Sequence, residues 1–183
     1  MASAFSHAIV ALTLGKVSNS DIINWRTLAL GIFCSVVPDL DVIGFRYGVQ
    51  YGDLWGHRGI THSLFFAVLL SAVLVCAFYF RKPTAGIVGV FLYLFVCTAS
   101  HGVLDAMTNG GLGVAFFSPF NTERYFFGFR PIVVSPISVH QFFDERGLQV
   151  LASEAKWVWL PSFLLLVIGR AFKGNRCACG LIG

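Results

Sequence analysis

Five apolar stretches, separated by polar or charged connections, dominate the pattern of hydrophobic positions along the chain. They cover residues 2–15, 27–37, 64–80, 85–107 and 157–172. A helix that spans a bilayer needs about 20 predominantly apolar residues, so the fourth stretch is long enough and the first is short for a full span. The pattern predicts an all-α helix bundle with about four to five membrane segments.

Composition favours a bilayer over water as the surroundings of these helices. The chain has 183 residues, of which 56% are hydrophobic and only 12% are charged, whereas an ordinary soluble domain has about 25% charged residues. A soluble domain of this size leaves too much surface in water to hide so many apolar side chains. We therefore expect residues 1–183 to form a single integral membrane domain in the lipid bilayer.

Three groups of Lys and Arg flank alternate ends of the apolar stretches and indicate an orientation. They are Lys16 with Arg26, Arg81 with Lys82, and Arg170 with Lys173 and Arg176. Cytoplasmic loops of membrane proteins carry an excess of basic residues, so these groups are expected in the cytoplasm. The net charge is +4, and the basic residues are too scattered to form a continuous positive surface along a nucleic-acid backbone. This argues against nucleic acid as a partner.

Residues 108–156 are the one substantial stretch expected outside the membrane. They mix glycines and aromatic residues with polar ones. An irregular interfacial segment that lies over the polar end of the bundle as a lid is one interpretation, and a plain interfacial loop is the other. We expect the acidic side chains of Asp53, Asp144, Glu145 and Glu154 to lie in water.

His and Asp residues in or beside the apolar stretches fall on the same, extracytoplasmic side of this topology. Four separate passages of the chain carry them. They are His7, Asp39, Asp41, His57, His62, His101 and Asp105. This convergence predicts a metal site near the extracytoplasmic face, although a proton relay or a structural ion-pair network would use the same residue types.

The spacing of these residues supports a metal site. His101 and Asp105 are four residues apart and share one helix face. An ionisable group at that depth costs about 2.5–3.5 kcal/mol on insertion scales, which makes it a functional candidate.

Pro38 is expected to end the second helix and to leave Asp39 and Asp41 in an extended or turn geometry. Side chains two residues apart then diverge, so one aspartate can ligate while the other orients a histidine. In HRGITHS, Gly59 predicts a turn that brings His57 and His62 together. Thr61 or Ser63 is expected to cap the helix that follows.

Imidazole and carboxylate ligands without thiolates suit a divalent metal, with Zn²⁺ foremost and Mn²⁺ or Fe²⁺ as alternatives. Seven candidates exceed the four ligands of a closed tetrahedral site. They fit two ions, or one ion with supporting residues and an open water position. An open position is what metal-assisted hydrolysis requires.

Other polar residues leave alternatives open. Arg58 lies inside the histidine motif, and its planar guanidinium suits a phosphate group. Arg124 and Arg130 lie on the same side, where lipid headgroups are the more ordinary contact. His140 is a weaker candidate for a metal ligand.

The cysteines give little functional information. Cys34, Cys76 and Cys97 fall in apolar stretches and are expected to pack as small hydrophobic residues. Cys177 and Cys179 form a CxC pair, which has too few ligands for a structural zinc site, so their role is open.

Several motifs resemble the YdjM-like family of bacterial inner-membrane, metal-dependent hydrolases. The matching pieces are SHAIVALTLG, VVPDLDVIG, GHRGITHS, ASHGVLD and SPFNTERYFFGFRPIVVSPIS. The resemblance runs from about residue 3 to 140. It implies a multi-pass protein of the bacterial inner membrane and a metal-dependent hydrolase that uses the seven His and Asp residues above. The order His, Asp, His and then HxxxD is also faintly similar to zinc-dependent phospholipase C.

The leading hypothesis is a membrane-embedded, metal-dependent hydrolase that acts on a phosphoester, such as a lipid headgroup or a polyprenyl phosphate. Asp39 or Asp41 would act as the base, and Arg58 would neutralise the phosphate. The alternative is a non-catalytic protein that binds or transports metal, or a scaffold whose helices the metal holds together.

Overall fold

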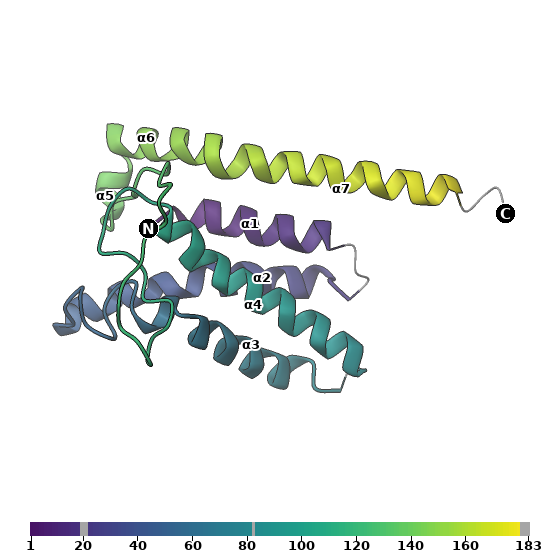
Figure 1. Cartoon of the computed structure of the whole chain (residues 1–183), viewed down its shortest axis with the longest axis horizontal. Coiled ribbons are helices and arrows are strands. Elements are labelled where there is room, and N and C mark those ends of the chain that lie inside the picture. The colour runs from purple at the N-terminus through teal and green to yellow at the C-terminus, as the bar shows by residue number, and fades with distance from the viewer. Residues whose placement is uncertain (19–21, 82, 180–183) are drawn as a thin grey trace.

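The computed structural model describes residues 1–18, 22–81 and 83–179, and it describes no side chains at 84, 85, 139 and 172–179. Its main helices lie side by side as one bundle (Figure 1). They are α1 (Ala4–Val17), α2 (Trp25–Val36), α3 (Leu64–Phe78), α4 (Thr84–Ala106) and α7 (Leu160–Cys179). Within the described ranges there is no strand, only two isolated bridges that pair Thr108 with Ile132 and Val114 with Tyr125. The expected all-α helix bundle is confirmed.

Three helical stretches are long and apolar enough to cross a membrane: Trp25–Tyr47, Gly86–Ala106 and Glu145–Ala171. The helices α1 and α3 are apolar but shorter. At the centre of the bundle, Tyr93 and Leu94 pack against Ala11 and Cys34. The outer faces remain apolar and exposed, which suits contact with lipid.

Pro38 does not end the second helix, so the extended geometry expected for Asp39 and Asp41 is wrong. The chain continues from α2 directly into a 3₁₀-helix, η1 (Val37–Tyr47). Pro38 lies in the first turn of η1, where a missing N–H is tolerated because it has no partner within the helix. The chain therefore stays helical past the proline, and the span extends over 23 residues from Trp25 to Tyr47.

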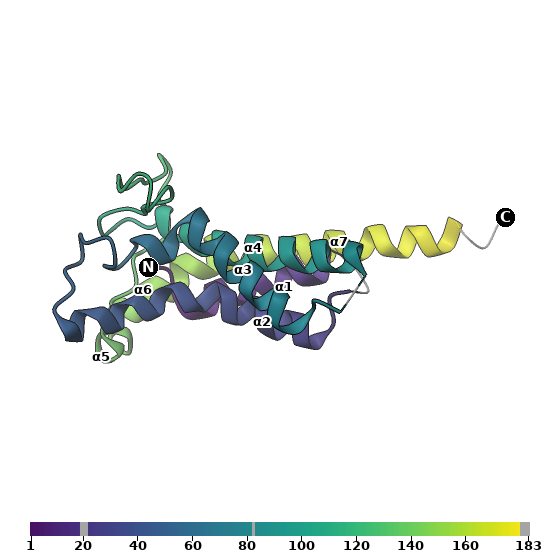
Figure 2. The ribbon, with the colours of Figure 1, turned by 90° about the horizontal axis from the view of Figure 1, so that it is seen from below.

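The last helix begins earlier than residue 157, where the apolar stretch begins. After the short helix α5 (Val139–Phe142), the chain forms α6 (Glu145–Glu154), a π-helical turn η3 (Ala155–Trp159) and then α7 without a break. The irregular part of the outer segment is therefore shorter than expected. Figures 1 and 2 show that α7 extends beyond the other helices at the end opposite the N-terminus.

Glu154 is completely buried, so its expected place in water is wrong, while Asp144 and Glu145 are exposed as expected. Its carboxylate accepts hydrogen bonds from Ser3 N and Ser3 Oγ, both at 2.5 Å, and from Ser6 Oγ at 2.8 Å. A buried carboxylate is tolerated when donors surround it. Glu154 therefore fastens the start of α1 to α6.

We expect Glu154→Ala to lower the free energy of unfolding by roughly 1–3 kcal/mol, because it leaves buried donors of Ser3 and Ser6 without an acceptor. Thermal unfolding in detergent, followed by circular dichroism, measures the effect. Glu145→Ala, at an exposed position of the same helix, is the matched control and should leave stability unchanged. Equal effects of the two substitutions would contradict the role of Glu154.

Candidate metal centre

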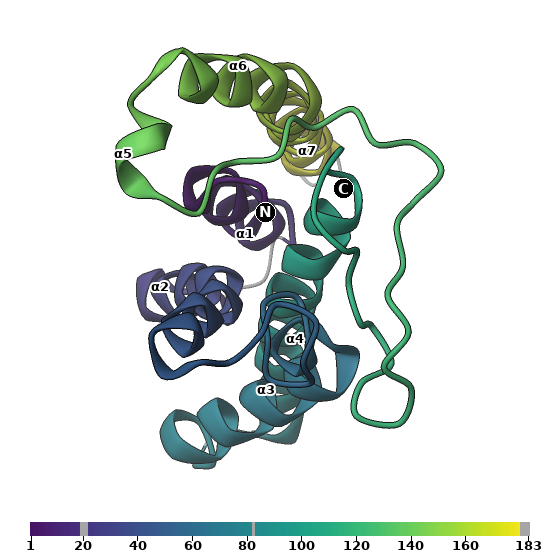
Figure 3. The same ribbon diagram turned by 90° about the vertical axis from the view of Figure 1, so that its left-hand side faces the viewer.

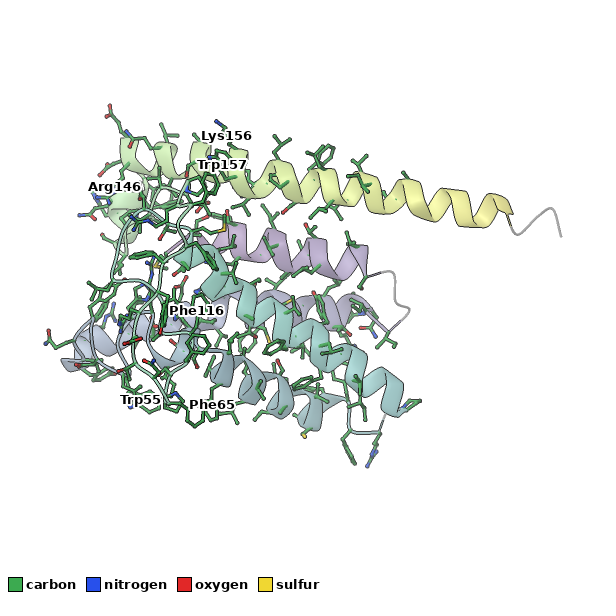
Figure 4. All side chains as sticks on the ribbon, in the orientation of Figure 1. Trp55, Phe65, Phe116, Arg146, Lys156 and Trp157 are labelled. Atoms are coloured by element: carbon green, nitrogen blue, oxygen red, sulfur yellow. The ribbon has the colours of Figure 1, made fainter. Side chains whose placement is uncertain are left out.

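All seven predicted metal-site residues lie at the end of the bundle that carries the N-terminus and the long loops. Figure 3 views this end directly, and Figure 4 shows the side chains crowded there. Helix α1 carries His7, η1 carries both aspartates, and α4 carries His101 and Asp105. His57 lies in the loop after η1, and His62 ends the short helix η2 (Ile60–His62).

Four of these side chains form one buried cluster. Asp39, His62, His101 and Asp105 each offer one ligand atom, and these atoms all lie within 4.8 Å of one another. His101 Nε2 lies 3.0 Å from His62 Nε2 and 3.3 Å from Asp39 Oδ1. His62 Nε2 lies 3.6 Å from Asp105 Oδ2 and 3.7 Å from Asp39 Oδ1. We call these four residues the metal cluster.

Hydrogen bonds outside the metal cluster orient both imidazoles. His101 Nδ1 donates to the carbonyl of Ser35 at 2.7 Å, which leaves the Nε2 lone pair facing Asp39. His62 Nδ1 lies 3.0 Å from Thr61 Oγ1, which itself donates to Asp41 Oδ2 at 2.7 Å. Partners of this kind hold a metal-ligating histidine in one tautomer.

The distances in the metal cluster fit a divalent ion. Ligands about 2.0–2.1 Å from a tetrahedral zinc ion lie roughly 3.3–3.4 Å from one another, and the measured separations lie close to that value. Both carboxylate oxygens of Asp39 are buried and accept no hydrogen bond from the described residues. The metal cluster could therefore bind a metal ion.

The pKa of His62 shows that this part of the protein attracts positive charge. Burial acts to lower it, but the carboxylates of Asp105, Asp39 and Asp41 outweigh burial and raise the pKa of His62 to about 10. A proton or a divalent cation can supply that charge.

Asp41 pairs with His57 and also lies close to His62, whose Nδ1 is 3.3 Å from Asp41 Oδ2. His57 Nδ1 donates to Asp41 Oδ1 at 2.7 Å, and the other carboxylate oxygen accepts from Arg58 N at 3.2 Å. His57 Nε2 is buried and has no hydrogen-bond partner among the described residues. Burial lowers the pKa of His57 below its usual value although Asp41 opposes the shift. The structure thus forms a His57–Asp41 pair beside the metal cluster, and Asp41, His57 and His62 can also form a second ligand set.

His7 lies at the edge of the metal cluster. Its ring stacks on that of His101 with centroids 3.8 Å apart, and its Nε2 lies 3.7 Å from Asp105 Oδ1. It belongs to neither set of mutually close ligand atoms. Its role as a ligand stays a prediction.

Arg58 is fully buried and contacts protein groups. Its Nε lies 3.1 Å from Asp105 Oδ2, while Nη1 donates to the Gly110 carbonyl at 2.8 Å and Nη2 donates to Thr108 Oγ1 at 3.0 Å. Its backbone has a left-handed φ of 63°, which costs free energy in a residue with a Cβ. Arg58 therefore positions Asp105, and its contact with a phosphate stays a prediction.

The remaining arginine candidates contact other parts of the protein. Arg124 donates to the carbonyls of His57, Tyr51 and Asp53 and so joins two loops. Arg130 lies over the ring of Phe126.

His140 is exposed on α5 and lies in neither ligand set. Cys34 and Cys97 are buried as expected, while Cys76 is exposed. The side chains of Cys177 and Cys179 lie outside the described residues.

A cavity of about 530 Å³ opens beside His57. Its polar lining includes Tyr51, His57 and Arg146, and its apolar lining includes Val134 and Ile137. Tyr51 and Arg146 could not be identified from the sequence, because a tyrosine in a loop and an arginine on an amphipathic helix carry no signal of their own. We call this space the His57 cavity.

Comparisons with known proteins agree with the motifs. A family model described as YdjM inner membrane protein matches residues 1–176. The chain is 41% identical to inner membrane protein YbcI of Escherichia coli (strain K12) over 167 residues, which cover 91% of this chain and 95% of that protein. No solved structure gives a significant match. The fainter likeness to zinc-dependent phospholipase C finds no support here and stays a prediction.

We expect Asp39→Asn and His101→Gln each to reduce tightly bound zinc from about one ion per chain to less than about one tenth, because each removes a ligand. Elemental analysis of protein purified without chelators measures the content. Asp53→Asn changes an exposed aspartate of the neighbouring loop and should leave it unchanged. Full zinc content in both ligand variants would contradict the metal cluster.

Zinc binding should also release protons. His62, with its pKa raised to about 10, carries a proton at pH 7 in the metal-free protein, and a cation that binds Nε2 must displace it. We expect about one proton released per ion and an affinity that rises about tenfold per pH unit between pH 7 and 9. Calorimetry in two buffers of different ionisation enthalpy gives the number of protons released per ion. Zinc binding without proton release would contradict the protonated state of His62.

Proposed function

Because the chain belongs to the YdjM inner membrane protein family, we propose that it is a membrane-embedded, metal-dependent hydrolase. Its substrate is a phosphoester, such as a lipid headgroup or a polyprenyl phosphate. One observation carries the proposal: a buried cluster of metal-ligand type lies beside a histidine that an aspartate orients and that faces a cavity. A metal site that only stabilises the fold does not need an aspartate-oriented histidine beside a cavity.

Each member of the metal cluster has a defined task in this proposal. Four ligands would hold the ion: Asp39, His62, His101 and Asp105. A bound ion would act as a Lewis acid and would lower the pKa of a coordinated water. Arg58 and the backbone N–H of Ala2 hold the Asp105 carboxylate in place, at 3.1 Å and 2.7 Å.

The geometry favours His57 over the aspartates as the base. Both oxygens of Asp41 already accept hydrogen bonds, from His57, Arg58 N and Thr61, and Asp39 belongs to the metal cluster. His57 lines the cavity, and its Nε2 is buried and has no hydrogen-bond partner among the described residues. In the proposed reaction His57 Nε2 accepts a proton from the attacking water, and Asp41 holds the ring in the required tautomer.

The His57 cavity suits an amphipathic phosphoester. Arg146 supplies a positive charge for the phosphate, while Val134 and Ile137 supply apolar surface. Three aspartates close by would repel a phosphate, so binding requires the charge of the metal ion as well. We place this end of the bundle at the extracytoplasmic face, on the distribution of basic residues.

Non-catalytic metal binding is the second candidate. The contacts of Asp105 with Ala2 and Arg58 join distant parts of the chain, as a scaffold would require. Transport has less support, because the middle of the bundle is filled by an apolar core that includes Tyr93 and Leu94.

We expect His57→Gln to reduce hydrolysis by about 10²-fold or more, because it removes the proton acceptor, while the zinc content stays at the level of the unmodified protein. Release of inorganic phosphate from polyprenyl phosphate, and of the free or phosphorylated headgroup from phospholipids, measures activity with and without a chelator. His140→Gln, at an exposed histidine, is the control and should retain activity. A scaffold is indicated instead if the unmodified, zinc-loaded protein hydrolyses none of these substrates.

A further inference from the structure

An apolar groove of about 390 Å³ lies beside α3, a helix at the opposite edge of the bundle from α6 (Figure 3). Its walls come from Leu64, Phe65 and Val68 of α3, Phe95 of α4, and Phe116 and Phe117 of the loop after α4. Figure 4 shows Phe65 and Phe116 together beside α3, away from Arg146. We call this space the Phe groove.

The Phe groove opens onto the surface that faces lipid. Phe65 and Val68 are 42% and 46% exposed, whereas Ala67 and Ser71 of the same helix are buried. Val73, farther along α3, is also exposed, at 56%. In a membrane protein such a face contacts acyl chains, so a lipid chain can enter the Phe groove from the side without crossing water.

One polar group lies in this apolar lining. Ser118 is completely buried and lines the Phe groove, and its Oγ has no hydrogen-bond partner among the described residues. A buried hydroxyl without a partner costs free energy, so a ligand that accepts from it is favoured. The ester carbonyl of a phospholipid is such an acceptor, whereas the hydrocarbon of a polyprenyl phosphate has none.

The groove adjoins the backbone of the metal cluster. Leu64 follows His62 by two residues and donates its N–H to the carbonyl of Phe116 at 3.0 Å. The ring of Phe116 also packs on the helix beside His101, since a Cβ added at Gly102 would lie 3.2 Å from it. The inner end of the Phe groove is therefore level with the cluster.

We propose that the Phe groove binds one acyl chain of an ester-linked membrane phospholipid, and that Ser118 Oγ donates a hydrogen bond to its ester carbonyl. This binding goes beyond the proposed hydrolysis, and it holds whether or not the protein is an enzyme. Its tests measure lipid occupancy and require neither bound metal nor turnover.

The first test uses photocrosslinking. The full chain is placed in vesicles of phosphatidylethanolamine and phosphatidylglycerol that contain a phospholipid with a diazirine in its acyl chain, and crosslinked peptides are quantified by mass spectrometry. We expect crosslinks on residues 116–120 to fall about fivefold or more in Val68→Trp, which fills the Phe groove. Val73→Trp adds the same bulk elsewhere on the exposed face of α3 and should leave them unchanged. Equal yields in the two variants would overturn the proposal.

The second test isolates the hydroxyl. Native mass spectrometry of protein purified with ester-linked or ether-linked phosphatidylglycerol gives the retained lipid. Ser118→Ala is expected to reduce retention of the ester lipid by roughly two- to tenfold, as loss of one hydrogen bond implies, and to leave the ether lipid unchanged. The proposal fails if both lipids are affected equally or neither is affected. If the unmodified protein retains the ester lipid but hydrolyses no phosphoester, the result contradicts the proposed function alone and leaves the proposed lipid binding intact.

Discussion

Negative charge buried at one end of an apolar bundle is the constraint on which the rest of this structure depends. Asp39 and Asp105 lie almost or completely out of solvent, where an ionised carboxylate is stable only with donors or cations around it. The chain supplies them from remote positions: the N–H of Ala2, the guanidinium of Arg58 and the imidazoles of the metal cluster. Asp39 retains oxygens without a hydrogen bond, which is what a divalent ion would use.

The 3₁₀-helix η1 places its two aspartates, Asp39 and Asp41, in different environments. Asp39 faces His62 Nε2 and His101, whereas Asp41 accepts a hydrogen bond from His57 and lies 3.3 Å from His62 Nδ1. A tight helix places residues two apart on different sides of its axis, so neighbouring aspartates serve a metal cluster and a His–Asp pair. A hydrolytic site needs both, because one part binds the ion and the other handles the proton.

Local pattern predicted the helices well and failed where a partner lay far away in the sequence. The apolar stretches match α1 to α4 closely because hydropathy is a property of neighbouring residues. Glu154 was misplaced because its donors, Ser3 and Ser6, lie about 150 residues away. Pro38 was misjudged because the same residue can end one helix or begin another, and only the packing around η1 decides which.

The sequence alone determined that this protein is a membrane helix bundle and that its His and Asp residues gather at one end. Both follow from hydropathy and from the order of segments, which the chain fixes locally. Only the tertiary structure decided which aspartate faces which histidine, that Arg58 supports Asp105, and that His57 borders a cavity. Those pairings depend on contacts as distant as Ala2 with Asp105, 103 residues apart, and such contacts exist only once the helices have packed.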